Sequence, residues 1–112
     1  MHRYLISFDD GTMIIPDEDL PAVSDASRAV VREIKAAGAW IFGGGILTQQ
    51  ASIVAVDGSV SDGPFPETKA VLGGFSIIEV ASRDDALSWA AKLAAACRCT
   101  QEVREIMYDP ES

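Results

Sequence analysis

Residues 74–97, GFSIIEVASRDDALSWAAKLAAAC, place a strand, a helix start and a helix in immediate succession. Residues 74–81 are rich in apolar and β-branched side chains, which is typical of a strand. Ser82 follows as a helix N-cap, and Asp85 at the third helical position makes a short capping box. The helix is then expected to bury a stripe formed by Leu87, Ala90, Leu93 and Ala94. This stretch therefore predicts one strand–helix unit.

The first half of the chain repeats this order of strand and helix. Residues 3–9 (RYLISFD) alternate, so the predicted strand has an apolar face made of Tyr4, Ile6 and Phe8. Residues 22–37 predict an amphipathic helix, because apolar residues recur at spacings of three and four, at Val23, Ala26, Val30, Ile34 and Ala37. Gly38 stands where a helix C-cap belongs. A second strand–helix unit is therefore expected near the amino terminus.

Further strands are expected after each helix. Residues 39–48 predict a strand in which Trp40 and Phe42 share a face and residues 43–45 (GGG) allow a bulge or close packing. Residues 52–56 and 59–61 predict a hairpin turned by Asp57 and Gly58. Residues 100–107 alternate again and predict the last strand. The order predicts an α+β fold, a ferredoxin-like βαββαβ sandwich with an extra β-hairpin and both helices on one face.

Composition limits the classes of function. The chain of 112 residues is expected to form one domain, residues 1–112, and its 48% apolar residues indicate a globular protein. A net charge of −8 argues against binding to nucleic acid or to anionic membranes. The sequence contains no signal-peptide pattern and no stretch of about 20 apolar residues, which predicts a cytoplasmic protein with no membrane contact.

Residues 62–69 (DGPFPETK), followed by residues 72–75 (LGGF), form the most distinctive motif. With Gly44 upstream and residues 85–90 downstream, this pattern resembles the DGPF-type branch of the YCII-related family, over nearly the whole chain up to Val103. The resemblance implies a dimeric α/β barrel, in which two ferredoxin-like sheets pack face to face. The family's suggested active-site pair includes a histidine near the start of the first helix. The matching position here is Ser27, so the proposed catalytic histidine is missing.

The motif also has a physical interpretation. Asp62 closes the hairpin, while Gly63 and Pro64 make a stiff corner that presents Phe65. Glu67 and Lys69 flank Thr68 and would point the same way on an extended segment, so the pair could bind a polar ligand or transfer a proton. Alternatively Phe65 plugs a barrel end and the charges are surface contacts. The candidate ligand-binding residues are Asp62, Phe65, Glu67, Thr68, Lys69 and Ser27, and the structural glycines and proline are Gly44, Gly63, Pro64, Gly73 and Gly74.

Metal and redox chemistry find little support in the sequence. Cys97 and Cys99 are expected to be reduced and partly buried, since even on a shared strand they would be poorly directed for a disulfide. With a lone histidine, His2, they cannot complete a zinc site. The acidic clusters at residues 9–10 and 17–19 lack the spacing of a calcium loop. We therefore expect neither a metal nor a cofactor.

Two hypotheses about function follow. The first is a dimer, formed through the uncovered sheet face, that binds a small polar or aromatic metabolite in a cleft near the DGPF loop. The alternative is a small-molecule enzyme that uses Asp62, Glu67 and Lys69 for acid/base isomerisation or lactone chemistry.

Overall fold

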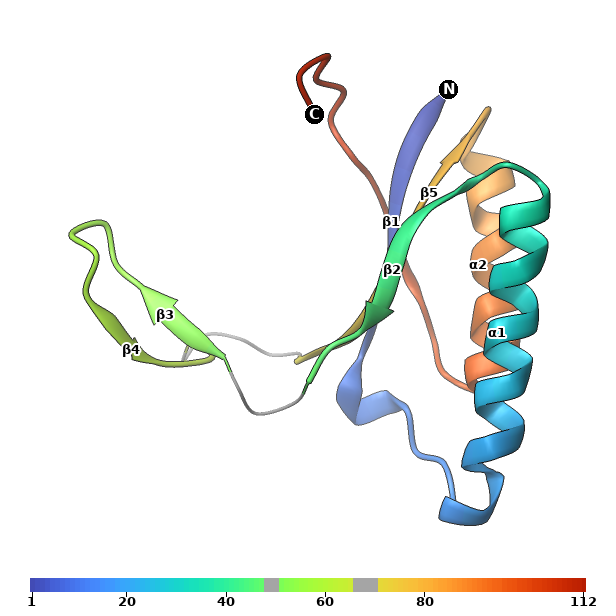
Figure 1. The fold of residues 1–112 in the computed structure, drawn as a ribbon, viewed down its shortest axis with the longest axis horizontal. Helices are drawn as coiled ribbons and strands as arrows, with labels where there is room; N and C mark the ends of the chain where they lie inside the picture. The colour runs from blue at the N-terminus through green and yellow to red at the C-terminus, as the bar shows by residue number, and fades with distance from the viewer. Residues whose placement is uncertain (48–50, 66–70) are drawn as a thin grey trace.

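Within residues 1–47, 51–65 and 71–112, which the computed structural model describes, an antiparallel sheet of four strands carries two helices on one face (Figure 1). The strands are β1 (His2–Asp9), β2 (Trp40–Gly45), β5 (Leu72–Val80) and β6 (Glu102–Glu105). Their order in the sheet is β2-β5-β1-β6. The helices are α1 (Leu20–Ala36) and α2 (Arg83–Cys97), and two 3-10 turns, Asp10–Thr12 and Asp17–Asp19, lead from β1 into α1.

The topology confirms the predicted ferredoxin-like α+β fold. Each helix connects two strands that are not neighbours, α1 between β1 and β2 and α2 between β5 and β6. The extra hairpin consists of β3 (Ser52–Val54) and β4 (Val60–Asp62), paired antiparallel around a turn at Asp57 and Gly58. The hairpin projects from the side of the sheet that the helices leave uncovered (Figure 1).

Helix α1 confirms the predicted amphipathic helix but buries a slightly different stripe. Val23, Val30 and Ile34 are buried, whereas Ala26 and Ala37, expected in the same stripe, are exposed. Ser27 takes the place of Ala26, because positions 23, 27, 30 and 34 are spaced by four, three and four residues and lie on one face. The helix ends before Gly38, whose φ of +74° favours glycine.

Helix α2 begins as expected, with the Ser82 hydroxyl accepting a hydrogen bond from the Asp85 N–H at 3.2 Å. Its buried stripe differs by one position. Ala86, Ala90 and Leu93 are buried, but Leu87 is 42% exposed, so its assignment to the stripe was wrong. Cys97 is the last residue of α2, and Cys99 follows a left-handed Arg98. Neither cysteine lies in a strand, and both are free thiols as expected.

The core lies between the sheet and the helices. Ile6 of β1, Ile78 of β5 and Ile34 of α1 are the largest side chains that are fully buried, and Tyr4 of β1 is also buried. Burial of each such aliphatic side chain stabilises the fold by about 1.5–3 kcal/mol. None of the helices in the described ranges is long and apolar enough to span a membrane.

A bulge in β2 changes which way its aromatic residues face. Trp40 pairs with Ile78, and Phe42 pairs with the next residue, Ile77, so Ile41 is an extra residue in β2. Trp40 consequently packs toward the helices and Phe42 lies on the opposite face. The expectation that Trp40 and Phe42 share a face was wrong, because alternation does not survive an inserted residue.

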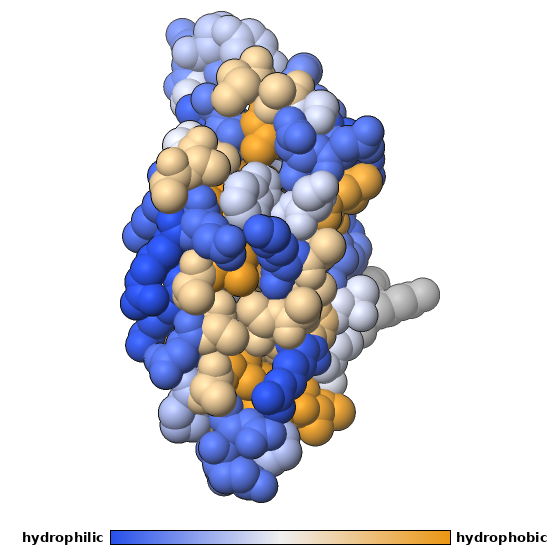
Figure 2. Space-filling model, turned by 90° about the vertical axis from the view of Figure 1, so that its right-hand side faces the viewer, coloured by the Kyte–Doolittle hydropathy of each residue, from blue (hydrophilic) through white to orange (hydrophobic). Residues whose placement is uncertain are grey.

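The sheet face opposite the helices carries an apolar cluster. Cross-strand pairing puts Ile77 between Leu5 of β1 and Phe42 of β2, and Phe75 next to Phe42, with ring centroids 5.9 Å apart. Phe42 is 62% exposed. The outer face of the helices is mixed: hydrophilic and weakly apolar residues cover most of it, with smaller strongly apolar patches between them (Figure 2). We call the face with Leu5, Phe42, Phe75 and Ile77 the open face.

Candidate functional site

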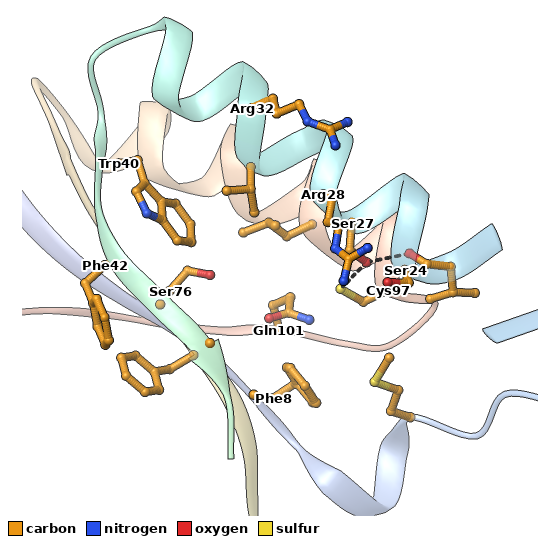
Figure 3. A pocket seen from close by; sticks show the side chains of 18 of the residues that line it. Phe8, Ser24, Ser27, Arg28, Arg32, Trp40, Phe42, Ser76, Cys97 and Gln101 are labelled. Carbon is orange, nitrogen blue, oxygen red and sulfur yellow. Dashed lines mark hydrogen bonds between the residues drawn. The ribbon is translucent and has the colours of Figure 1, made fainter. Parts of the chain in front are cut away.

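A cavity of about 950 Å³ lies between α1 and the β2 edge of the sheet (Figure 3). The end of α2 and residues near β1 complete its walls. Helix α1 contributes Leu20, Val23, Ser24, Ser27, Arg28, Val31, Arg32 and Lys35, and the sheet contributes Phe8, Trp40, Phe42, Gly43, Gly44, Gly45, Phe75 and Ser76. The remaining lining residues are Met13, Leu93, Cys97 and Gln101.

The cavity exists because small residues face each other across it. Gly43 of β2 pairs with Ser76 of β5, and both lie on the helix side of the sheet, opposite Ser24 and Ser27 of α1. A Cβ at Gly43 would lie 2.6 Å from the Phe75 carbonyl oxygen and 2.9 Å from the Ser76 Cα. The backbone therefore excludes a side chain at Gly43, and neither layer fills the space.

Aromatic rings form much of the wall. Trp40 and Phe8 lie on the helix side of the sheet, and Phe42 and Phe75 border the cavity where it passes the edge of β2. Figure 3 shows the Trp40 ring beneath α1 and Ser76 beside β2. Flat, polarisable walls of this kind suit a planar ligand.

Ser27 and Cys97 are joined by a hydrogen bond at one end of the cavity (Figure 3). The Ser27 hydroxyl donates to the Val23 carbonyl at 2.8 Å, and Ser27 Oγ lies 3.3 Å from Cys97 Sγ. Because the hydroxyl proton points at the carbonyl, the thiol is the donor of the second bond. Both groups are satisfied and neither contacts a base, so Ser27 is not an activated nucleophile.

Apart from the Cys97 thiol, the titratable side chains of the cavity are cationic. Arg28, Arg32 and Lys35 line it, and no Asp, Glu or His of the described ranges does. The groups with shifted pKa values lie elsewhere: burial, and then the Glu105 carboxylate, raises the pKa of Tyr4, and the Ser59 N–H lowers that of Asp57. Burial, and then the nearby Cys97, raises the pKa of the Cys99 thiol. The lining that the structure describes thus provides no carboxylate or imidazole as a general acid or base.

The DGPF motif lies apart from this cavity as far as the structure describes it. Asp62 is the last residue of β4 and is exposed, and Phe65 is 61% exposed. Neither residue lines the cavity. The predicted site residues Glu67, Thr68 and Lys69 lie outside the described residues. Of the candidate ligand-binding residues, Ser27 alone is placed in the cavity wall within the described ranges.

The motif glycines differ in how tightly they are packed. A Cβ at Gly73 would lie 2.6 Å from the Phe8 ring and 2.8 Å from the Asp10 Cα, and one at Gly74 would lie 2.8 Å from the same ring. Gly63, before Pro64, donates its N–H to the Ala51 carbonyl at 2.9 Å. Gly44 pairs with Phe75 at the edge of the sheet, and a Cβ there would meet nothing within 4 Å.

The acidic clusters and His2 have local structural partners. Asp9 accepts a hydrogen bond from the Gly11 N–H at 2.9 Å, and Asp19 pairs with Arg98 at 2.8 Å. His2 Nδ1 lies 3.4 Å from a Glu105 carboxylate oxygen. Within residues 1–47, 51–65 and 71–112, no three His, Cys, Asp or Glu side chains gather as metal ligands do.

Sequence reasoning missed the cations of the site and the role of Trp40. Arg28, Arg32 and Lys35 fall outside the apolar pattern of the predicted helix, and the polar side of α1 that carries them borders the cavity. One signal was available. Small residues at 43, 45 and 76, opposite Ser24 and Ser27, leave a gap that apolar periodicity alone does not reveal.

The fold and the cavity define a ferredoxin-like α+β protein with a cavity at the edge of its sheet. The model of the YCII-related domain matches residues 3–108, so the chain belongs to the YCII-related family. Among solved structures, it is similar to 5-chloro-2-hydroxyhydroquinone dehydrochlorinase (TftG) from Burkholderia phenoliruptrix AC1100, in complex with 2,5-dihydroxybenzoquinone. The TM-score is 0.52 at 19% identity, over 97% of each chain, which shows a shared fold. No curated protein gave a significant match.

Proposed function

We propose that the chain binds a small polar aromatic molecule in the cavity between α1 and β2. The observation that carries this proposal is the combination of size and lining. A volume of about 950 Å³ suits one small molecule, and the walls combine aromatic rings with a few polar groups. Trp40 and Phe8 would contact the flat faces of the ligand, while Ser24, Ser76 and Gln101 would orient its polar atoms.

The structural neighbour supports the same class of ligand. TftG was solved with 2,5-dihydroxybenzoquinone, which is a small planar ring with polar substituents. At 19% identity this supports the kind of ligand and leaves its identity to experiment.

A small-molecule enzyme is the second candidate, because TftG is a dehydrochlorinase. Acid/base isomerisation or lactone chemistry needs a group that moves a proton, and the candidates from the sequence are Asp62, Glu67 and Lys69. The described lining contains no carboxylate and no imidazole. Binding without catalysis is therefore the function that the described geometry favours.

The indole N–H signals of the protein can test this proposal. The chain has two tryptophans, Trp40 in the cavity wall and Trp89 on α2 outside it. Titration of the isotope-labelled protein with 4-hydroxybenzamide, 4-hydroxybenzoate and 2,5-dihydroxybenzoquinone should move the Trp40 signal saturably with at least one compound. The Trp89 signal should stay in place. Trp40→Phe and Trp89→Phe variants assign the two signals.

A pair of adjacent substitutions provides the control. Ser27→Leu places a larger side chain in the cavity and should abolish the response, whereas Ala26→Leu adds the same bulk at an exposed position of α1 and should preserve it. The proposal fails if no compound moves Trp40 saturably, or if folded Ser27→Leu protein binds as well as Ala26→Leu protein.

A further inference from the structure

Positive and negative side chains are distributed differently at the cavity and in the rest of the chain. The protein has 17 acidic and 9 basic residues, which should give most of its surface a negative potential. Within the described ranges, the cavity is nevertheless lined by three of the nine basic residues, Arg28, Arg32 and Lys35, and by no acidic residue. The average composition of this acidic chain therefore does not explain why the charged side chains at the cavity are all positive.

The other basic residues mostly have a carboxylate partner. Ion pairs join Arg3 to Glu79 at 2.8 Å, Lys92 to Glu33 at 3.3 Å, Arg98 to Asp19 at 2.8 Å and Arg104 to Glu102 at 2.6 Å. Arg28, Arg32 and Lys35 form no ion pair with any carboxylate in the described part of the chain. The cations at the cavity therefore keep their capacity to bind an anion from solution.

The helix places these cations along one wall. Residues 24, 28, 32 and 35 are spaced by four, four and three positions, so they follow one face of α1, next to the buried stripe that contains Ser27. Figure 3 shows the Arg28 side chain in the region of Ser24, Ser27 and Cys97, with Arg32 one turn farther along the helix. Arg28 is thus the cation best placed to meet a ligand that reaches Ser27.

We propose that the ligand is an aromatic anion, with a planar ring against Trp40 and Phe8 and a carboxylate bound by Arg28. A guanidinium can bind a carboxylate through two parallel hydrogen bonds, which fixes the orientation of the ligand as well as its charge. Arg32 and Lys35 add positive potential along the same wall. This inference rests on the proposed function, since it names the chemical class of ligand for the same cavity.

Because the molecule as a whole is negatively charged, a preference for an anionic ligand requires positive charge at the cavity itself. A net charge of −8 disfavours the approach of an anion, so a neutral analogue would bind at least as well if the cavity contributed no charge of its own. A preference for the anion over its neutral isostere therefore reports directly on the cationic wall.

The test compares 4-hydroxybenzoate with 4-hydroxybenzamide, which have the same shape and differ in charge, with dissociation constants measured from the Trp40 indole signal. Wild-type protein should bind the carboxylate about tenfold or more tightly than the amide. Arg28→Gln should reduce that ratio to about threefold or less, with little change for the amide, and Arg28→Lys should restore part of it. Arg83→Gln is the matched control, because it removes one positive charge outside the cavity and should preserve the ratio.

The outcomes separate this inference from the proposed function. Equal affinity of wild-type protein for the two compounds would overturn the aromatic-anion inference and leave binding in the cavity intact. The inference would also be overturned if folded Arg28→Gln protein kept the wild-type preference for the carboxylate over the amide. The same holds if Arg83→Gln reduced that preference as much as Arg28→Gln does. If neither compound nor 2,5-dihydroxybenzoquinone moves Trp40, the proposed function itself fails. Raising the salt concentration from about 0.02 M to about 0.5 M should weaken the binding of 4-hydroxybenzoate and leave the binding of 4-hydroxybenzamide unchanged, because salt screens only the interaction between charges.

Discussion

Phe8 lies against the backbone of β5 so closely that two positions there have no room for a side chain. The Phe8 ring would be 2.6 Å from a Cβ at Gly73 and 2.8 Å from one at Gly74. The Asp10 N–H donates to the Val71 carbonyl at 2.7 Å, which holds the chain after β1 against the start of β5. The Phe8 ring also lines the cavity, so this contact fixes one of the cavity's aromatic walls.

Gly73→Ala should therefore destabilise the protein. The added methyl group would meet the Asp10 backbone at 2.8 Å, which cannot move as a flexible side-chain end can, so overpacking should cost about 1–3 kcal/mol. Gly44→Ala is the control, because a Cβ there meets nothing within 4 Å and the change should stay within about 0.5 kcal/mol. Urea unfolding midpoints measure both. Equal midpoints for the two variants would contradict the tight packing at Gly73.

At the scale of single residues, the sequence predicted packing better than chemistry. A Gly-Gly pair before a strand indicates a close contact, and Gly73 and Gly74 do make one. Arg28 could not be recognised as a candidate ligand-binding residue. The sequence pattern of an arginine on the polar face of a helix is the same whether that face borders solvent or a cavity. Leu87 was placed in the core for a related reason: the apolar face of an alanine-rich helix is poorly defined by residue type, and Ala86 is the residue buried there.

Among the elements, α2 is the helix whose start depends most clearly on a side chain. The Ser82 hydroxyl accepts from the Asp85 N–H at 3.2 Å and satisfies a donor that has no partner inside the helix. Asp84 and Asp85 in the first turn also interact favourably with the amino-terminal end of the helix dipole.

Ser82→Ala should lower the free energy of unfolding by about 1 kcal/mol, because it removes the cap. Ser88→Ala is the matched control: Ser88 is exposed inside the same helix, where alanine is the better helix former and should stabilise by a few tenths of a kcal/mol. Thermal unfolding followed by circular dichroism measures both changes. The capping interpretation is wrong if the two variants melt together.

The order of helices and strands was predictable because the hydrophobic pattern has a clear helical period in α1 and alternates in β1, while Ser82 marks the start of α2. The deviations have local causes. The bulge at Ile41 inserts one residue into β2 and separates Trp40 from Phe42, and no composition signal marks an inserted residue. Helix α2 continues to Cys97, and the left-handed Arg98 makes the turn that leads to Cys99.

At the scale of the whole molecule, the sheet is covered on one side only. Ile78 is fully buried under the helices, whereas its neighbour Ile77 points to the open face beside Leu5, Phe42 and Phe75. The hairpin formed by β3 and β4 extends from this same side, with Val54 and Val60 each 67% exposed (Figure 1). An exposed apolar face with an apolar hairpin beside it is typical of a protein–protein interface. In a symmetric homodimer, the second copy would contribute the same apolar surface.

We therefore predict a homodimer that forms through the open face. Ile77→Glu places a charge at the centre of that face and should give monomers of about 11.9 kDa in light scattering, against about twice that mass for the wild type. Leu87→Glu, on the outside of α2, makes the same change in the helix layer and should leave the dimer intact. Leu5→Glu is a second variant of the open face, in case Ile77→Glu does not fold, and circular dichroism reports folding in each case. A wild-type monomer, or folded open-face variants that remain dimeric, would show that the open face is not the interface.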